Sequence, residues 1–484
     1  MIVLFHPRST RPKNRRLPLS VLHLAAVLEG REEYTIVDGN VDPDPSSTLD
    51  ALAGSHSIEL LAVSVMPGPQ LRAAVPVCRA FREKYPRIPI VWGGYFPSLY
   101  TAAALNARYV DFVVKGQGED ALLELIEVLR GGSDFSRVRG LAFKDAFGLP
   151  VHTPERPLKS PDEFPWLPYH RLDPSKYLAH TFLGSRTTVH QASIGCPFRC
   201  NFCGVVPVYD REKMESPART AAILNHLQRT YGVNAVQFYD NNFFLREEHA
   251  KELAARIAPL NLHWWCEARV DIVLRYSDAT LRQLRRAGCV MIFFGVESGA
   301  DAALEGMNKQ LTAEQTLALA ARIRQFGIVP EYSLIFGNPA DPERDLAENI
   351  AFVRRVKRVN PDVEIVVQTY VPTPQRGATF GDAVIEFPST PDEWIMDPWY
   401  RLLIRTDPQL PWLSPRVKRR IRDFETVMNA RWPTTQDVRL PAWGRALLKA
   451  LSSWRYALSA YDFPAELRLA QKLVRLRQPR LESL

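Results

Sequence analysis

Cysteine and long apolar runs are both scarce in this sequence. Only 6 of the 484 residues are cysteine, and no stretch of roughly 18 residues is continuously apolar. The missing apolar run argues against a membrane-spanning helix, and the few cysteines favour a reducing compartment over a disulfide scaffold. The opening residues MIVLF lead into a predicted strand without the basic segment of a signal peptide. We therefore expect a cytoplasmic protein.

Negative charge is scarce in one part of the chain. Residues 401–484 contain 17 Lys or Arg against 7 Asp or Glu, a net charge of +10, whereas the whole chain carries +8. The basic character therefore belongs to the C-terminal region, and the remainder is close to neutral. Because no nucleic-acid-binding module is recognisable, we expect no nucleic-acid partner.

Three of the cysteines lie together in the segment GCPFRCNFCG. Cys196, Cys200 and Cys203 have the spacing CxxxCxxC, and no fourth cysteine is nearby. A [4Fe–4S] cube normally takes four cysteines, so three would leave one iron open to a small ligand. Zinc is the alternative, although its structural sites usually add a second ligand pair further along the chain. The other cysteines are predicted to be core residues: Cys78, Cys266 and Cys289.

Two regions alternate predicted strands with predicted helices. In residues 1–145 the pattern predicts a parallel, doubly wound, Rossmann-like sheet. In residues 186–385 it predicts six β/α units. Residues 146–185 between them contain repeated prolines and are predicted to be a linker, because proline interrupts regular structure. Residues 386–484 are predicted to be mostly helical. The fold class is therefore α/β with a helical C-terminal region.

The cysteine segment, with Phe202 just before its last cysteine, resembles the CxxxCxΦC motif of the radical S-adenosylmethionine (SAM) superfamily. The resemblance implies that Cys196, Cys200 and Cys203 hold a [4Fe–4S] cluster and that Phe202 lies beside the adenine of SAM. In that family an external reductant of the flavodoxin or ferredoxin type reduces the cluster. The reduced cluster then cleaves SAM to a 5′-deoxyadenosyl radical. The six β/α units match the partial (β/α)6 TIM-type barrel of the family, whose sites lie at the carboxyl ends of the strands.

Further segments after predicted barrel strands resemble motifs of the same superfamily. YDNNF presents Asp240 to the SAM amino group, although the asparagine that follows leaves open which side chain makes the contact. GVESG implies Glu297 near SAM, and SLIFGNP implies Ser333 on the adenine side. Arg269 follows the third barrel strand, where a cation would meet the SAM carboxylate or ribose. The alternative for Asp240 and Glu297 is that they are ordinary loop carboxylates.

Loops of the N-terminal region, above all WGGYFPS and VVKGQGEDALLELI, resemble the cobalamin-binding domain that precedes many radical SAM modules. Ligands of a doubly wound sheet bind at the carboxyl ends of its strands, and glycine lets a backbone approach a ligand closely. The resemblance implies that these loops contribute a set of cofactor-binding residues: Gly93, Gly94, Gly116, Gly118 and Glu119. Ordinary turn chemistry is the alternative explanation for the glycines.

The histidines of the N-terminal region lack the motif of a cobalt ligand. Cobalamin-dependent mutases carry DxHxxG, in which the histidine ligates cobalt, and this sequence has no such motif. His6 follows the first predicted strand, but no aspartate precedes it at the required spacing. We therefore expect cobalamin to bind without a histidine ligand, and His6 and His23 to be packed or solvated.

An apolar stripe marks one predicted C-terminal helix. Its residues recur at helical spacing on one face, opposite Arg445, Lys449 and Ser452: Trp443, Leu447, Leu451, Trp454 and Leu458. The stripe predicts packing against the barrel. The alternative is an interfacial helix with a basic face toward anionic lipid at the inner membrane face, which would suit a lipid-like or poorly soluble substrate.

Together the motifs predict a cobalamin-dependent radical SAM enzyme with a small-molecule substrate. The expected cofactors are a [4Fe–4S] cluster, SAM and cobalamin. Methylation of an unactivated carbon is the favoured reaction. The alternatives are oxidative cyclisation or rearrangement with the same cofactors, and a non-catalytic cobalamin or redox sensor. The predicted domains are a cobalamin-binding domain (1–145), a linker (146–185), a radical SAM core (186–385) and a basic helical region (386–484).

Overall fold

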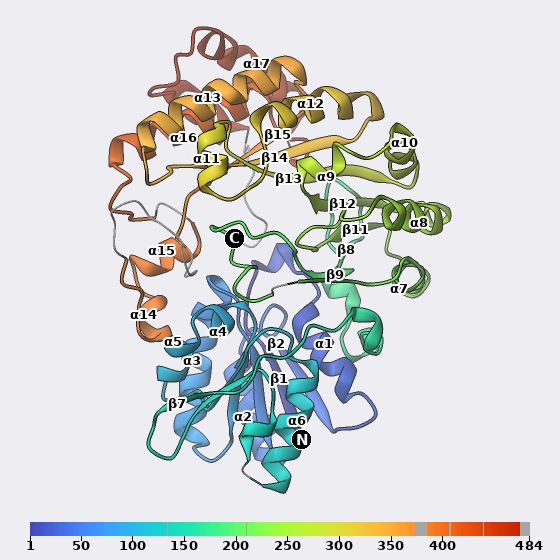
Figure 1. Ribbon diagram of the computed structural model, residues 1–484, viewed down its shortest axis with the longest axis vertical. Coiled ribbons are helices and arrows are strands. Elements are labelled where there is room, and N and C mark those ends of the chain that lie inside the picture. Colours follow the sequence, from blue (N-terminus) through green and yellow to red (C-terminus); the bar gives the residue numbers. More distant parts are fainter. Residues whose placement is uncertain (133, 210, 373–384, 406–407, 439, 475–484) are drawn as a thin grey trace.

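The computed structural model describes residues 1–132, 134–209, 211–372, 385–405, 408–438 and 440–474. Two largely parallel sheets form the two halves of the molecule, with the N-terminal sheet in the lower half of Figure 1 and the second sheet above it. The helices of the C-terminal region lie along the second sheet and reach down to the first (Figure 1).

The N-terminal sheet has seven strands in the order β2-β1-β3-β4-β5-β6-β7. The first five are parallel and their order is that of a flavodoxin-like doubly wound sheet. Strands β1 and β3 are buried along their whole length, as expected for central strands covered on both faces. The strands are β1 (Ile2–His6), β2 (Tyr34–Asp38), β3 (Leu60–Ser64), β4 (Ile90–Gly93), β5 (Phe112–Val114), β6 (Leu141–Lys144) and β7 (Pro150–His152).

Helices cover both faces of this sheet. Helices α1 (Leu19–Leu28) and α6 (Glu119–Gly131) pack on the face that carries Ile2 and Leu4. Helices α2 (Pro45–Ser55) and α3 (Pro69–Lys84) belong to the core on the opposite face, and the short helices α4 (Tyr95–Leu99) and α5 (Thr101–Asn106) follow β4. The doubly wound arrangement predicted from the sequence is therefore confirmed.

The sheet extends beyond residue 145, where the sequence pattern placed its end. That residue lies in the turn of a hairpin, because β7 pairs antiparallel with β6. Pro150 is tolerated there because β7 is the edge strand, where a missing N–H leaves no ladder bond unmade. The proline-rich connection begins only after His152 and contains three short 3-10 turns.

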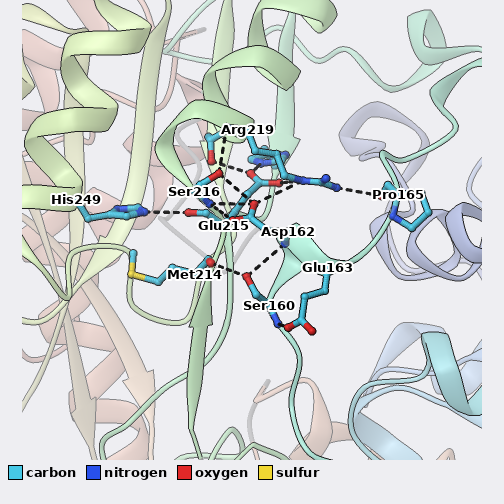
Figure 2. A network of polar contacts seen from close by, with 11 residues as sticks. Ser160, Asp162, Glu163, Pro165, Met214, Glu215, Ser216, Arg219 and His249 are labelled. Atoms are coloured by element: carbon cyan, nitrogen blue, oxygen red, sulfur yellow. Dashed lines mark hydrogen bonds and ion pairs between the residues drawn. The ribbon is translucent and has the colours of Figure 1, made fainter.

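The linker is fastened to the second half by a network of polar contacts (Figure 2). Asp162 accepts a hydrogen bond from the backbone N–H of Ser216 at 3.0 Å, just before α7 (Pro217–Tyr231). Arg219, in the first turn of α7, donates to the carbonyl of Pro165 at 3.0 Å and to Glu215 at 3.0 Å. The first barrel helix therefore also anchors the connection between the halves.

The second sheet has six parallel strands in the order β15-β14-β13-β12-β11-β8. A helix follows each of the first five along the chain, so the predicted (β/α)6 partial barrel is confirmed. The strands are β8 (Thr187–His190), β11 (Ala235–Phe238), β12 (His263–Ala268), β13 (Cys289–Glu297), β14 (Val329–Phe336) and β15 (Glu364–Thr369). The helices are α7, α8 (Glu247–Ile257), α10 (Asp278–Arg286), α12 (Ala313–Ile323) and α13 (Pro342–Val359).

The C-terminal region joins both halves. Helix α14 (Pro391–Trp394) meets the N-terminal half, where Trp394 is fully buried against Phe96 and Tyr100. Helix α15 (Trp399–Leu403) follows it, and α16 (Pro415–Arg431) packs on α13 of the barrel. Helices α17 (Ala442–Ala457) and α18 (Ala465–Leu473) then pack on α16.

The expected packing of the apolar stripe against the barrel is wrong. Trp443, Trp454 and Leu458 are 63%, 50% and 73% exposed. Helix α17 instead buries its other face, where Gly444 and Ser452 allow close approach and the Ser452 hydroxyl donates to the Leu448 carbonyl at 2.7 Å. The described part of the chain contains no helix that is long and apolar enough to cross a membrane.

Candidate functional site

A cavity of ≈ 810 Å³ lies between the two halves. Its volume is in the upper part of the range for ligand pockets, roughly 300–1,000 Å³. The loops after β4 and β5 line it from the N-terminal half, with every predicted residue of those loops present: Gly93, Gly94, Gly116, Gly118 and Glu119. The barrel contributes residues such as Gly204 of the cysteine loop, Gln237 and Asn241. The carboxyl ends of both sheets therefore open onto one space.

Backbone conformation explains two of these glycines. Gly94 has φ 97° and ψ −171°, and a Cβ atom there would lie 2.8 Å from the carbonyl oxygen of Val65. Gly116 has φ 72°. Side chains are strained in such conformations, so both loops need glycine to make their turns. The glycine loops and the volume of the cavity fit a large cofactor such as cobalamin.

Glu119, at the start of α6, is the acidic member of this wall. Burial raises its pKa to about 7. His23 lies beside it, with Nδ1 3.6 Å from Oε1 of Glu119, and burial lowers the pKa of His23 to about 4. The pair is therefore close to neutral, as suits the wall of a cavity with little solvent.

The cysteine loop follows the short strand β9 (Ser193–Gly195), which pairs with β10 (Glu212–Met214). Cys200 is buried, Cys196 and Cys203 are partly buried, and all three are free thiols. Burial raises the pKa of Cys203 to about 11, so an unliganded thiol stays protonated and a bound metal would displace its proton. Arg269 stands beside the loop, with Nη1 3.7 Å from the Cys200 sulfur.

The thiols fit a cluster better than a single ion. In the part of the chain that the structure describes, no three His, Cys, Asp or Glu side chains converge as they would around one metal ion. An iron–sulfur cube attaches each cysteine to a different iron and so needs no such convergence. The zinc alternative therefore has no geometric support.

Glu297 is the last residue of β13 and has a positive φ of 71°. Its Oε1 accepts a hydrogen bond from Lys309 Nζ at 2.9 Å within a buried ion pair. The same ammonium lies 5.8 Å from the ring centroid of Phe202, and the Lys309 carbonyl accepts from Arg269 at 2.6 Å. Lys309, which no sequence motif singled out, therefore links Glu297 to the cysteine loop.

Asp240 follows β11 and is 1% exposed. Neither of its carboxylate oxygens has a hydrogen-bond partner among the described residues, and the same holds for both side-chain polar atoms of Asn242. Burial raises the pKa of Asp240 to about 7. Buried polar atoms without partners are rare in proteins, and a missing ligand is one explanation. These orphaned atoms beside the cysteine loop fit the polar groups of SAM.

Ser333 does not line the cavity. It lies within β14, is 3% exposed, and its hydroxyl accepts from Gln368 Nε2 at 3.1 Å. Phe202, Asp240 and Glu297 are likewise absent from the cavity wall and gather instead around the cysteine loop. The predicted residues thus fall into a cavity set and a cluster-side set, with Ser333 outside both.

The sequence analysis missed two carboxylates inside the barrel. Glu267 on β12 and Glu331 on β14 both line the cavity. Trp265 and Gln436 donate to Glu331 at 3.1 and 2.5 Å, whereas Glu267 accepts no hydrogen bond from the described residues. Burial, with the charge of Glu331 next, raises the pKa of Glu267 to about 8. An acidic residue within a predicted barrel strand was the signal available in the sequence.

Comparison with known proteins gives two family matches. Residues 11–126 match the B12 binding domain, and residues 191–353 match the radical SAM superfamily. The chain is 25% identical over 346 residues to an uncharacterised methyltransferase of Pyrococcus horikoshii, covering 70% of this chain and 73% of that one. It is 26% identical over 384 residues to an anaerobic magnesium-protoporphyrin IX monomethyl ester cyclase of Synechocystis, covering 78% and 74%.

A solved structure has the same fold. The radical SAM methyltransferase TsrM of Kitasatospora setae superposes with a TM-score of 0.67, at 18% identity and over 98% of both chains. The N-terminal sheet, the barrel and the C-terminal helices are thus all matched in one known architecture.

Proposed function

Because the chain is a B12-binding radical SAM enzyme, with cobalamin, a [4Fe–4S] cluster and SAM as its cofactors, we propose that it methylates an unactivated carbon of a small molecule. The observation that carries the proposal is the shared cavity. Loops of the cobalamin-binding half and strand ends of the radical SAM half line one space, so a substrate there would meet both cofactor systems. A methyltransferase among its relatives supports this reaction.

The chain's own residues would hold the cofactors as follows. Cys196, Cys200 and Cys203 would supply three thiolates to the cluster. Asp240, buried and unpartnered, would accept the SAM amino group. The two glycine loops would support cobalamin. When bound, these cofactors supply a 5′-deoxyadenosyl radical and a transferable methyl group, and the protein's part is to orient them and exclude water.

Two cations assist the cluster side of the site. Arg269 lies against the Cys200 sulfur and over the ring of Phe198 at 3.7 Å, so its charge favours thiolate over thiol. Lys309 neutralises Glu297, which keeps a second negative charge from developing beside the cluster. The electron would come from a flavodoxin- or ferredoxin-type reductant.

The test uses the anaerobically reconstituted enzyme with SAM deuterated on its methyl group. Reduction should yield 5′-deoxyadenosine, and the product should gain a deuterated methyl group in mass spectrometry. No 5′-deoxyadenosine under reducing conditions would refute the enzyme assignment and favour a sensor. Deoxyadenosine with a product that loses hydrogen but gains no label would favour the second candidate, oxidative cyclisation, which a cyclase relative supports.

We also propose that helix α17 makes a peripheral membrane contact. Its exposed face, the α17 apolar face, consists of Trp443, Leu447, Trp454 and Leu458. Tryptophan and leucine on an exposed helix face suit the boundary of a bilayer, and the basic C-terminal region suits anionic lipid. Such a contact would give access to a lipid-like or poorly soluble substrate.

Two arginines expected on the lipid side have structural roles instead. Arg445 donates to the carbonyls of Thr434 and Asp437 at 2.9 and 2.8 Å. Arg455 is buried and paired with Glu466. Charge reversal at these positions would damage the fold, so the test must leave both unchanged.

The membrane contact is tested by co-sedimentation with vesicles. The wild type should pellet with vesicles rich in phosphatidylglycerol at low salt and less so at high salt. Replacing Trp443 and Trp454 by Ser should abolish pelleting. Replacing Trp166, which is 44% exposed in the linker, is the matched control and should have no effect. A wild type that stays in the supernatant with anionic vesicles at low salt would refute the contact.

A further inference from the structure

His6 occupies a position in the cavity that its sequence context did not reveal. It is the last residue of β1, it is buried, and it lines the cavity between the two halves. It stands beside Asp38 in the parallel register of β1 and β2. The His6 Nδ1 atom lies 3.0 Å from Oδ1 of Asp38.

Asp38 is held as an ionised hydrogen-bond acceptor. Burial alone would raise its pKa, but hydrogen bonds from His6 and Tyr177 and from the backbone of Asn40 outweigh burial and keep the pKa below its ordinary value. The Tyr177 hydroxyl donates to Oδ2 at 2.7 Å, and the Asn40 N–H donates to Oδ1 at 2.9 Å. An ionised carboxylate at Nδ1 favours the imidazole tautomer with its proton on Nδ1.

That tautomer leaves the lone pair of Nε2 unused. No described residue makes a hydrogen bond with Nε2 of His6, and the side chain borders the cavity. A histidine that donates one ring N–H to a carboxylate and presents the other nitrogen to a ligand space is the usual arrangement of a metal-binding histidine. The carboxylate fixes the ring orientation and makes Nε2 more basic.

We propose that His6 ligates the cobalt of bound cobalamin through Nε2, with Asp38 and Tyr177 as positioning residues. This inference rests on the proposed cobalamin site and reverses the expectation that no histidine would serve. The DxHxxG motif carries its aspartate next to the histidine in sequence. Here the aspartate comes from the neighbouring strand, 32 residues away, so no local motif exists.

The test is the electron spin resonance spectrum of cob(II)alamin in the full-length protein. A nitrogen ligand splits the cobalt hyperfine lines into triplets when it is ¹⁴N and into doublets when it is ¹⁵N. Protein labelled with ¹⁵N-histidine and loaded with unlabelled cobalamin should give doublets, and unlabelled protein should give triplets. The base of cobalamin itself would give triplets in both, so the isotope separates the two nitrogen sources.

Variants identify the histidine. His6→Ala should lose the label-sensitive splitting. His23→Ala, which changes another histidine of the same cavity, should retain it. Asp38→Asn should retain bound cobalamin but alter the splitting, because the amide no longer fixes the tautomer.

The outcomes separate the two proposals. Bound cobalamin without label-sensitive splitting in the wild type would overturn the histidine ligand, whether or not His6→Ala folds. Label-sensitive splitting that persists in His6→Ala would overturn the choice of His6. A full chain that binds no cobalamin at all would overturn the cobalamin site itself and, with it, the proposed methylation.

Discussion

Replacing Gly94 by Ala tests how the cofactor cavity is built. Gly94 links β4 to α4 with φ 97° and ψ −171°, a region that is essentially restricted to glycine. The added methyl group would lie 2.8 Å from the Val65 carbonyl oxygen and 3.0 Å from its nitrogen. That carbonyl also accepts the backbone N–H of Phe96 at 3.0 Å, so it cannot move without disturbing the start of α4.

The magnitude follows from the backbone. A residue held in a sparsely populated conformation costs about 1–3 kcal/mol, and the contact with a hydrogen-bonded carbonyl adds to that. Each kcal/mol shifts the melting midpoint of a unit of this size by roughly 2–4 °C. We therefore expect Gly94→Ala to lower the midpoint by about 5 °C or more and to reduce cobalamin occupancy, because the displaced loop is part of the cavity wall.

A second glycine provides the matched control. Gly54 lies in α2 of the same half, and an added Cβ there would meet nothing within 4 Å. Alanine is favoured over glycine inside a helix by about 0.5–1 kcal/mol, so Gly54→Ala should raise the midpoint slightly. The assay is thermal unfolding of the metal-free protein followed by circular dichroism, with cobalamin uptake measured by absorbance. An unchanged midpoint and normal uptake in Gly94→Ala would refute the strain argument.

Three further predictions concern the barrel side of the molecule. Cys200→Ala should abolish iron–sulfur absorbance and SAM cleavage, whereas Cys289→Ala should preserve both; a full cluster in the first variant would refute the ligand assignment. Because the pKa of Glu267 is raised to about 8 from its ordinary 4.5, its stabilising contribution is complete below pH 4.5 and is lost as the pH rises toward 8. Glu267→Gln should therefore flatten the fall of the melting midpoint over that window, and an unaltered pH profile would contradict the shift. Lys309→Met leaves buried Glu297 unpaired and should cost about 3–5 kcal/mol in denaturant unfolding, much of it recovered by adding Glu297→Gln; a single variant as stable as wild type would contradict this.

The strand and helix pattern was predictable because it depends on local sequence. Continuous apolar runs such as Leu60–Ser64 indicated central parallel strands, and alternating strands and helices indicated the two sheets. The end of the N-terminal sheet was less predictable. Pro150 indicated a linker, but an edge strand accepts proline, and only the pairing of β7 with β6 makes this segment part of the sheet.

The C-terminal helix shows where periodicity is insufficient. The spacing from Trp443 to Leu458 correctly gives one apolar face, but it does not say which face is buried. Helix α17 buries Gly444, Leu448 and Ser452 because α16 and α18 pack closely there. Periodicity alone favoured burial of the larger side chains.

The sequence by itself determined the motifs whose residues are neighbours along the chain. The cysteine spacing, the glycine loops and the β/α alternation can be read directly, because each is contained within a few turns or one loop. Only the tertiary structure decided the pairings between distant segments. Asp38 meets His6 because β2 adds beside β1, and Lys309 meets Glu297 because a loop folds back under the end of β13. Glu267 and Glu331 share one cavity because β12 and β14 curve around the same interior. Such contacts depend on strand order and register, which no local pattern encodes.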